Sequence, residues 1–443
     1  MQKNLQVVTG VTAEHNGVPE DSLFFGLSFF RMPDASGNAP ESAWKAAHCD
    51  ARISPCGEAA MMRGKVEPDE PRLLAASALA GLFDALVHRG FHIIGPVVRD
   101  DAILLDHVQS PDELPAGFTD EQSPGHYRLK KTGDRRALFS YAVGPHSWKK
   151  YLHPSETTLW CAERQNGTFR ILNNESRPPR PFAFLGVRSC DLAAILIQDR
   201  VLTRDRYHDP VYSARRKDAF IVVVQCTHSS SSCFCASLGT GPRAKRGFDL
   251  ALTELISEHD HLFVVHPGSK RGARLLSELE TAAVTPEILQ RETEALESGA
   301  RQQVRKVETE GLKELLYKAF DDPRWETISA RCLTCANCTM SCPTCFCTTV
   351  EDLSDLAMSR AERWRRWDSC FTLSFSYIHG GSVRASGVAR YRQWMTHKFA
   401  AWIDQFGTVG CVGCGRCITW CPVGIDITEG IAALREGENH GNT

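Results

Sequence analysis

The segment Arg331–Cys347, RCLTCANCTMSCPTCFC, decides how the C-terminal part of the chain must fold. Its first four cysteines follow the spacing C-x2-C-x2-C-x3-C-P and are Cys332, Cys335, Cys338 and Cys342. The later segment CVGCGRCITWCP repeats this spacing to the residue, with Cys411, Cys414, Cys417 and Cys421. This is the ligand run of bacterial-type [4Fe–4S] ferredoxins. The duplicated motif therefore predicts two iron–sulfur clusters.

Each motif is expected to give its fourth cysteine to the cluster of the other motif. That cysteine begins the next segment, where the following proline suits the first turn of a helix. One cluster would then be bound by Cys332, Cys335, Cys338 and Cys421, and the second by Cys411, Cys414, Cys417 and Cys342. The alternative is a pair of zinc sites, but zinc motifs usually combine one C-x2-C pair with a distant second pair. Two adjacent clusters form a relay for single electrons.

Two cysteines of the opening segment, Cys345 and Cys347, are left over by this assignment. Together with Cys370, in the sequence WRRWDSC, they can supply three ligands of a further site. They can equally be buried thiols that pack around the clusters, because free cysteine often behaves as a small buried hydrophobic residue. The sequence leaves both possibilities open.

A third group of cysteines lies in the middle of the chain. Cys190 follows one predicted strand and Cys226 ends another. Because parallel strands end at the same edge of a sheet, where ligands bind, these two thiols are expected to converge. The loop after Cys226 carries Cys233 and Cys235, which can complete four ligands. We predict a third [4Fe–4S] cluster here; a zinc site and metal-free buried cysteines are the alternatives.

The pattern of apolar residues predicts a multidomain α+β protein, in which an α/β domain with a mainly parallel sheet precedes a helical, bacterial-ferredoxin-like 4Fe-4S dicluster domain. The runs PFAFLGVR (181–188), AFIVVVQC (219–226) and HLFVVHP (261–267) are typical of buried strands, whereas DLALTELISEH (249–259) is expected to be helical. We expect residues 1–70 to be an extension with little regular structure, 71–270 to be the α/β domain with the third cluster, 271–330 to be a helical connector, and 331–443 to be the dicluster domain with a helical insert at 350–405.

The 443 residues carry 51 basic and 53 acidic side chains, so composition gives no reason to expect nucleic acid as a partner. Seven arginines, Lys398 and three tryptophans gather between residues 360 and 398, where they suit an interface or cations beside anionic thiolates. No apolar run reaches the roughly 18 residues of a membrane span, and the first residues lack a secretory signal. Eighteen cysteines in a chain without such a signal indicate metal or redox chemistry in the cytoplasm.

Several motifs together resemble those of a known family. GVRSCDLAAI, CFCASLGTGP, the doubled cysteine motif, WDSC and RYRQWMTHKF occur in the order found in the beta subunit of sulfhydrogenases, which are soluble NAD(P)-linked [NiFe] hydrogenases. The corresponding iron–sulfur subunit of anaerobic sulfite reductases is similar throughout. The resemblance covers about residues 71–430. It implies a cytoplasmic complex in which this chain joins a flavin- and NAD(P)-binding gamma subunit to the hydrogenase small and large subunits.

We therefore predict an electron-transfer subunit with no catalytic residue of its own and with no membrane span. The flavin and NAD(P) are expected on a partner, because the chain has neither a G-x-G-x-x-G fingerprint nor a phosphate-binding P-loop. One alternative keeps the relay but makes its acceptor a sulfite-reducing subunit. An alternative of another class is a stand-alone flavin-binding oxidoreductase. A further alternative is a zinc-stabilised scaffold, which would be colourless.

Overall fold

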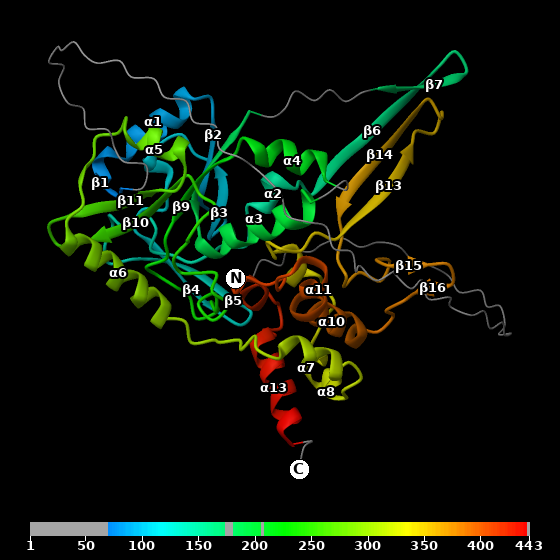
Figure 1. Ribbon diagram of the computed structural model, residues 1–443. Coiled ribbons are helices and arrows are strands. Elements are labelled where there is room, and N and C mark those ends of the chain that lie inside the picture. The colour runs from blue at the N-terminus through cyan, green and yellow to red at the C-terminus, as the bar shows by residue number, and fades with distance from the viewer. Residues whose placement is uncertain (1–69, 173–179, 205–207, 441–443) are drawn as a thin grey trace, which may run out of the picture. The chain divides into compact units, whose positions relative to one another are not determined.

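The structure is a computed structural model that describes residues 70–172, 180–204 and 208–440. The extension expected for residues 1–70 therefore lies almost wholly outside the described residues, as do Cys49 and Cys56. Figure 1 shows the order of the elements along the chain.

An eight-stranded sheet forms the centre of the first domain, in the order β12-β1-β11-β10-β9-β8-β2-β3. Its strands are β1 (Arg72–Ala75), β2 (His92–Arg99), β3 (Ala102–His107), β8 (Phe182–Val187), β9 (Phe220–Val224), β10 (Leu250–Ile256), β11 (His261–Pro267) and β12 (Ala282–Ala283). The inner strands β2, β8, β9 and β10 run parallel, and the outer strands pair antiparallel. Every residue of β9 is buried, as expected for a strand covered on both faces.

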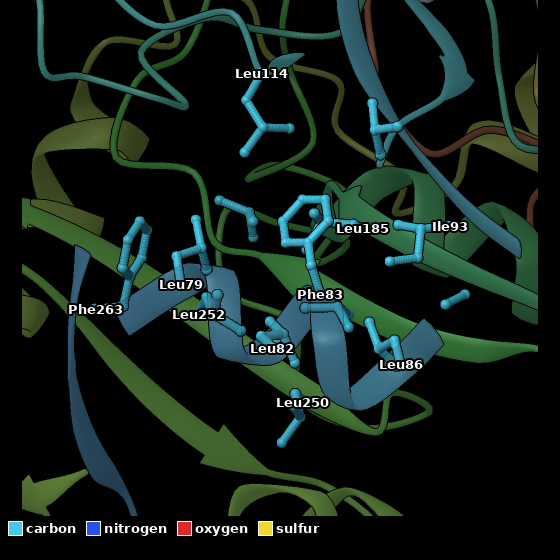
Figure 2. Close-up of a cluster of buried hydrophobic side chains, with 14 of the residues drawn as sticks. Leu79, Leu82, Phe83, Leu86, Ile93, Leu114, Leu185, Leu250, Leu252 and Phe263 are labelled. Carbon is cyan, nitrogen blue, oxygen red and sulfur yellow. The ribbon is translucent and has the colours of Figure 1, made fainter. Parts of the chain in front are cut away.

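Helices cover both faces of this sheet. Helix α1 (Leu79–His88) and helix α5 (Lys270–Leu276) pack on one face, in the cluster of buried side chains that Figure 2 shows around Phe83, Leu185 and Phe263. Helices α2 (Lys149–Leu152), α3 (Ser189–Leu202) and α4 (Pro210–Lys217) pack on the other face. The arrangement confirms the predicted α/β domain with a mainly parallel sheet.

The segment 249–259, expected to be helical, instead forms strand β10. The strand lies between β9 and β11, and its apolar residues are mostly buried. Its two polar side chains find partners inside the protein: Thr253 donates to Glu292 Oε1 at 2.6 Å, and the carboxylate of Glu254 accepts backbone N–H groups at 2.8 Å. Pairing with two neighbouring strands thus overrides the helix propensity of this segment.

A second, four-stranded sheet joins segments that are far apart in the sequence, in the order β13-β14-β6-β7. Its strands are β6 (Glu156–Gln165), β7 (Thr168–Leu172), β13 (Thr348–Ser354) and β14 (Arg360–Trp367), and Figure 1 shows them side by side. The expectation of a helical insert at 350–405 is therefore wrong for its first part. Cross-strand ion pairs such as Arg363–Asp352 suit a hairpin rather than a helix face.

The remaining elements are short strands and the helices of the connector and the C-terminal domain. The strands are β4 (Phe118–Ser123), β5 (His126–Lys131), β15 (Tyr377–Ile378) and β16 (Gly381–Ser382). The helices are α6 (Pro286–Arg301), α7 (Leu312–Lys318), α8 (Arg324–Ser329), α9 (Asn337–Met340), α10 (Gly387–Thr396), α11 (Trp402–Phe406), α12 (Arg416–Thr419) and α13 (Ile427–His440), with a π-helical turn at His397–Ala401. None of the described helices is long and apolar enough to cross a membrane.

A buried ion pair connects the α/β domain to the second cysteine motif. Arg416, at the start of α12, contacts Asp191, in the first turn of α3, through two bonds of 2.7 and 3.0 Å. Both side chains are almost completely buried. The same guanidinium also donates to the backbone oxygens of Gly144 and His146. This bidentate pair fixes the loop that carries Cys414 and Cys417 against the end of the sheet.

Replacing Asp191 by asparagine would leave the charge of Arg416 buried without its counter-charge. We expect the free energy of unfolding to fall by about 3–5 kcal/mol. Urea unfolding under anaerobic conditions, followed by circular dichroism, measures this change. The control is Asp352→Asn, which removes an exposed ion pair and should change the free energy by less than about 1 kcal/mol. Equal effects of the two substitutions would contradict the role assigned to the buried pair.

Candidate metal centres

The two cysteine motifs fold into loops of the same backbone conformation. The residues two and four positions after the first cysteine have positive φ in both loops: Thr334 (52°) and Ala336 (67°) in one, Gly413 (63°) and Gly415 (76°) in the other. A short helix follows each loop, α9 in the first and α12 in the second. The identical spacing of the cysteines therefore produces the same local structure twice.

Backbone N–H groups in both loops point at thiol sulfurs. The N–H of Thr334 donates to Cys332 Sγ at 3.4 Å, and the N–H of Gly413 donates to Cys411 Sγ at 3.5 Å. Left-handed residues such as these turn successive N–H groups towards one side of the loop, where they can stabilise negative charge. The loops are thus suited to hold thiolates rather than neutral thiols.

The four cysteines predicted to bind the first cluster line one hollow. Its wall includes Cys332, Cys335, Cys338 and Cys421, together with Cys417 and the apolar side chains of Phe371, Tyr391, Trp394, Ile425 and Ile427. Tyr391 and Trp394 are buried in the domain core. Among these thiols Cys335 is exposed, so the hollow lies close to the surface.

The four cysteines predicted to bind the second cluster also lie together, at greater depth. Burial raises the pKa of the Cys417 thiol, and the nearby thiols of Cys411, Cys414 and Cys342 raise it further. Burial likewise raises the pKa of Cys411 to about 12. Cys411 and Cys417 would stay protonated as free thiols, whereas binding of iron keeps a thiolate deprotonated. The fourth member differs, because Cys345, Lys398 and Thr344 lower the pKa of Cys342.

The arrangement of the donors distinguishes a site for a cluster from a site for a single metal ion. Within the part of the chain that the structure describes, no three histidine, cysteine or acidic side chains converge on the position of one ion. A zinc ion would need four ligand atoms within about 2.0–2.3 Å of one point. In a [4Fe–4S] cluster each of the four thiolates binds a different iron, so the sulfurs surround a larger group. Four cysteines at the ferredoxin spacing in each motif therefore fit [4Fe–4S] clusters better than zinc.

The third predicted set of ligands is also brought together. Cys190 lies in the first turn of α3, and Cys226 follows the end of β9. Burial raises the pKa of the Cys190 thiol well above its usual value, and Asp191, Cys235 and Cys226 add to the shift. Burial also raises the pKa of Cys235, and the nearby thiols of Cys233 and Cys226 add to the shift. The convergence expected at the end of parallel strands is thus present.

Polar side chains contact two sulfurs of this third group. Ser230 Oγ lies 3.2 Å from Cys233 Sγ, and Gln303 Nε2 donates to Cys235 Sγ at 3.3 Å. The serine belongs to the loop between Cys226 and Cys233. Gln303 comes from the segment after α6, and no sequence pattern pointed to it. Such donors stabilise a thiolate and set the potential of a bound cluster.

The third group lies directly against the second cysteine loop. The N–H of Phe234, between Cys233 and Cys235, donates to the carbonyl oxygen of Gly413 at 2.9 Å. Thr240 Oγ1 donates to the neighbouring carbonyl, that of Val412, at 2.7 Å. The backbones are so close that a Cβ atom at Gly413 would lie 2.6 Å from the amide nitrogen of Cys235.

A buried lysine supplies positive charge beside the second group. Lys398 lies in the π-helical turn, a deviation that often marks functional sites. Its Nζ atom donates to Cys342 Sγ at 3.2 Å, to Thr344 Oγ1 at 3.1 Å and to the backbone oxygen of Gly410 at 3.1 Å. Lys398 was one of the basic residues between 360 and 398, for which the sequence favoured an interface or cations beside thiolates. Its position agrees with the second interpretation.

The three leftover cysteines, Cys345, Cys347 and Cys370, are half-buried and lie close to Cys342 and to one another. Cys161, in β6, is buried away from all of these groups and contacts the carboxylate of Glu362. No sequence pattern pointed to Lys149, a second buried lysine whose Nζ donates to the backbone oxygen of Cys345 at 3.0 Å.

Comparisons with known proteins agree with this geometry. A family described as "4Fe-4S dicluster domain" matches residues 331–425, which include both cysteine motifs. Sulfhydrogenase 2 subunit beta of Pyrococcus furiosus is 37% identical to this chain over 281 residues, which are 62% of this chain and 80% of that protein. No solved structure matches.

The contact between the second motif and the middle loop can be tested with two glycines. Gly413 and Gly239 have nearly the same φ, +63° and +67°, but a Cβ at Gly239 meets nothing within 4 Å. Gly239→Ala should therefore cost only the roughly 1–2 kcal/mol of the left-handed conformation. Gly413→Ala should cost at least about 1 kcal/mol more, because the loops must separate. Thermal unfolding and iron content measure both effects, and equal losses would contradict the close packing.

Proposed function

This chain belongs to the sulfhydrogenase beta-subunit family and is an iron–sulfur electron-transfer subunit, and we propose that it relays electrons between a partner that binds flavin and NAD(P) and a [NiFe] hydrogenase module. The relative is a hydrogenase beta subunit, which implies a multi-subunit complex. The identity of these partners, like the cytoplasmic location that the resemblance implies, is part of the proposal.

We propose three [4Fe–4S] clusters, with the ligands predicted from the sequence. Cluster 1 would be held by Cys332, Cys335, Cys338 and Cys421, cluster 2 by Cys411, Cys414, Cys417 and Cys342, and cluster 3 by Cys190, Cys226, Cys233 and Cys235. The gathering of each set in the structure supports this assignment. When bound, a cluster supplies one-electron redox chemistry.

The observation that supports the proposed relay most directly is the order of the three thiol groups. Cys417, of the middle group, lines the same hollow as the cysteines of the first group. Cys414, also of the middle group, lies in one buried cluster with Cys190 and Cys235 of the third. The groups therefore form a continuous row from the exposed Cys335 to the edge of the central sheet, which suits transfer of electrons through the chain.

The residues around the row hold the thiolates and exclude water. N–H groups of the two loops, Lys398 and Gln303 direct positive ends of dipoles or positive charge at sulfur atoms. Such donors favour the more negative, reduced state of a bound cluster and so raise its potential. Buried aromatic side chains such as Trp394 close the hollow of the first group. The chain itself needs no acid, base or nucleophile for this task.

Two other functions remain as alternatives. An electron-transfer subunit of a sulfite reductase would use the same row of clusters, because the acceptor chemistry lies on another chain. A stand-alone flavin enzyme would hold flavin on the purified single chain. The similarity to a sulfhydrogenase subunit favours the hydrogenase complex.

Cluster number is measured by iron and acid-labile sulfide on anaerobically purified protein. The wild-type chain should contain at least about 12 irons, and Cys226→Ser should lose about four of them. Cys161→Ser is the matched control, since this buried cysteine lies outside every group, and it should keep all the iron. An unchanged iron content in Cys226→Ser would remove the third cluster from the proposal.

The relay itself is tested in the complex purified through a tag on this chain. We expect flavin and nickel to co-purify and NADH or NADPH to bleach the cluster absorbance. Cys411→Ser should lose at least about 90% of NAD(P)H-dependent hydrogen evolution while hydrogen evolution from a reduced viologen dye persists, because the dye reaches the nickel subunit directly. Oxidation of the reduced clusters by sulfite would favour the sulfite reductase, and flavin on the isolated chain would favour the stand-alone enzyme.

A further inference from the structure

The three cysteines outside the cluster assignments lie together. Cys345 and Cys347 precede β13, and Cys370 follows β14. The thiols of Cys347 and Cys370 lie close together, and the N–H of Asp368 donates to the backbone oxygen of Cys347 at 2.9 Å. The Cys345 thiol lies close to those of Cys342 and Cys347. Two segments about twenty residues apart are thus held with their thiols facing one region.

Two buried lysines face the same region. Lys398 is 3% exposed and Lys149 is 6% exposed. Lys149 reaches it from α2, with its Nζ atom bonded to the backbone oxygen of Cys345 and 3.9 Å from the centre of the Trp367 ring. Lys398 donates from its Nζ atom to Cys342 Sγ at 3.2 Å. Burial lowers the pKa of Lys149, so its ammonium form needs an anion close by.

Buried cations need buried negative charge close by, because the desolvation of an unpaired ammonium group is costly. Neither lysine has a carboxylate within ion-pair distance among the described residues. The thiolates of the second cluster, through Cys342 and Cys411, can balance Lys398. Lys149 lies against Cys345, and a thiolate there would balance its charge. Metal binding supplies such a thiolate, since it keeps coordinated thiols deprotonated.

We propose that Cys345, Cys347 and Cys370 bind an additional iron–sulfur centre through three thiolates, with Lys149 and Lys398 as its counter-charges. This assignment rests on the proposed function in one respect, namely that Cys342 belongs to the second cluster. Zinc fits less well, because it would need a fourth donor, and no three such side chains of the described residues converge on one ion. The remaining position of the centre is open to a ligand that is not cysteine.

The place of this centre gives it a distinct role. Cys370 packs against the same buried cluster as Cys338 of the first group, and Cys345 lies close to Cys342 of the second. The centre therefore lies beside the junction of the first two clusters rather than at either end of the row. It forms a branch at which an additional electron can be held while the main relay continues.

The test measures iron, sulfide and zinc in Cys347→Ser and Cys370→Ser, with Cys161→Ser as the control. Each of the two variants should lose about three to four irons per chain and contain no zinc. The electron paramagnetic resonance signals of the other clusters should persist. Unchanged iron, or zinc that is present in the wild type and lost in the variants, would overturn the proposal.

Two further measurements keep the test decisive where a variant fails to fold. The wild-type chain alone should contain about 15–16 irons, and a total of about 12 would exclude the additional centre. Lys149→Met should shift the potential of one centre to a more negative value, because a nearby cation stabilises the reduced state, and should leave the other potentials unchanged. Loss of iron in Cys226→Ser, but not in Cys347→Ser or Cys370→Ser, would leave the relay intact and reject only this inference.

Discussion

Negative charge on buried sulfur is the constraint on which the architecture depends. Twelve cysteines in three groups, and three more beside them, lie in a protein interior that would otherwise keep most of them as neutral thiols. The chain places fixed hydrogen-bond donors beside these sulfur atoms. They are the N–H groups of two loops, Gln303, and the buried side chains of Lys398 and Lys149. Each of these groups is costly to bury without a thiolate nearby, so donors and thiolates stabilise one another.

The same constraint explains why the two domains are inseparable at the site. Cysteines of the third group come from the end of the central sheet, while the adjacent second group comes from the C-terminal motif. The ion pair of Arg416 and Asp191 holds the second motif against the α/β domain. The close backbone contact of Gly413 with the loop of Cys235 does the same. An α/β domain of this kind therefore serves as a wall of the redox site as well as a scaffold.

The sequence predicted what depends on spacing and on strand ends. The duplicated C-x2-C-x2-C-x3-C-P run specified both loops, and the thiols after two parallel strands specified the convergence of Cys190 and Cys226. The sequence-based prediction was wrong where contacts with distant segments determine the secondary structure. The segment 249–259 became a strand because β9 and β11 lie on either side, and residues 348–367 became a hairpin because β6 offered a partner. Lys149 and Gln303 carry no motif, since their role arises only from the fold.

The left-handed residues of the two loops make the duplicated halves unequal. Thr334 and Ala336 show that the first loop tolerates side chains at these positions, whereas the backbones of Cys235 and Ser232 leave room only for Gly413 and Gly415 in the second. The copies have therefore lost the symmetry of a simple repeat, and one half cannot replace the other. The module therefore has an inner face, which packs against the loop of Cys235, and an outer face. An electron that passes between its two motifs moves either towards or away from the α/β domain.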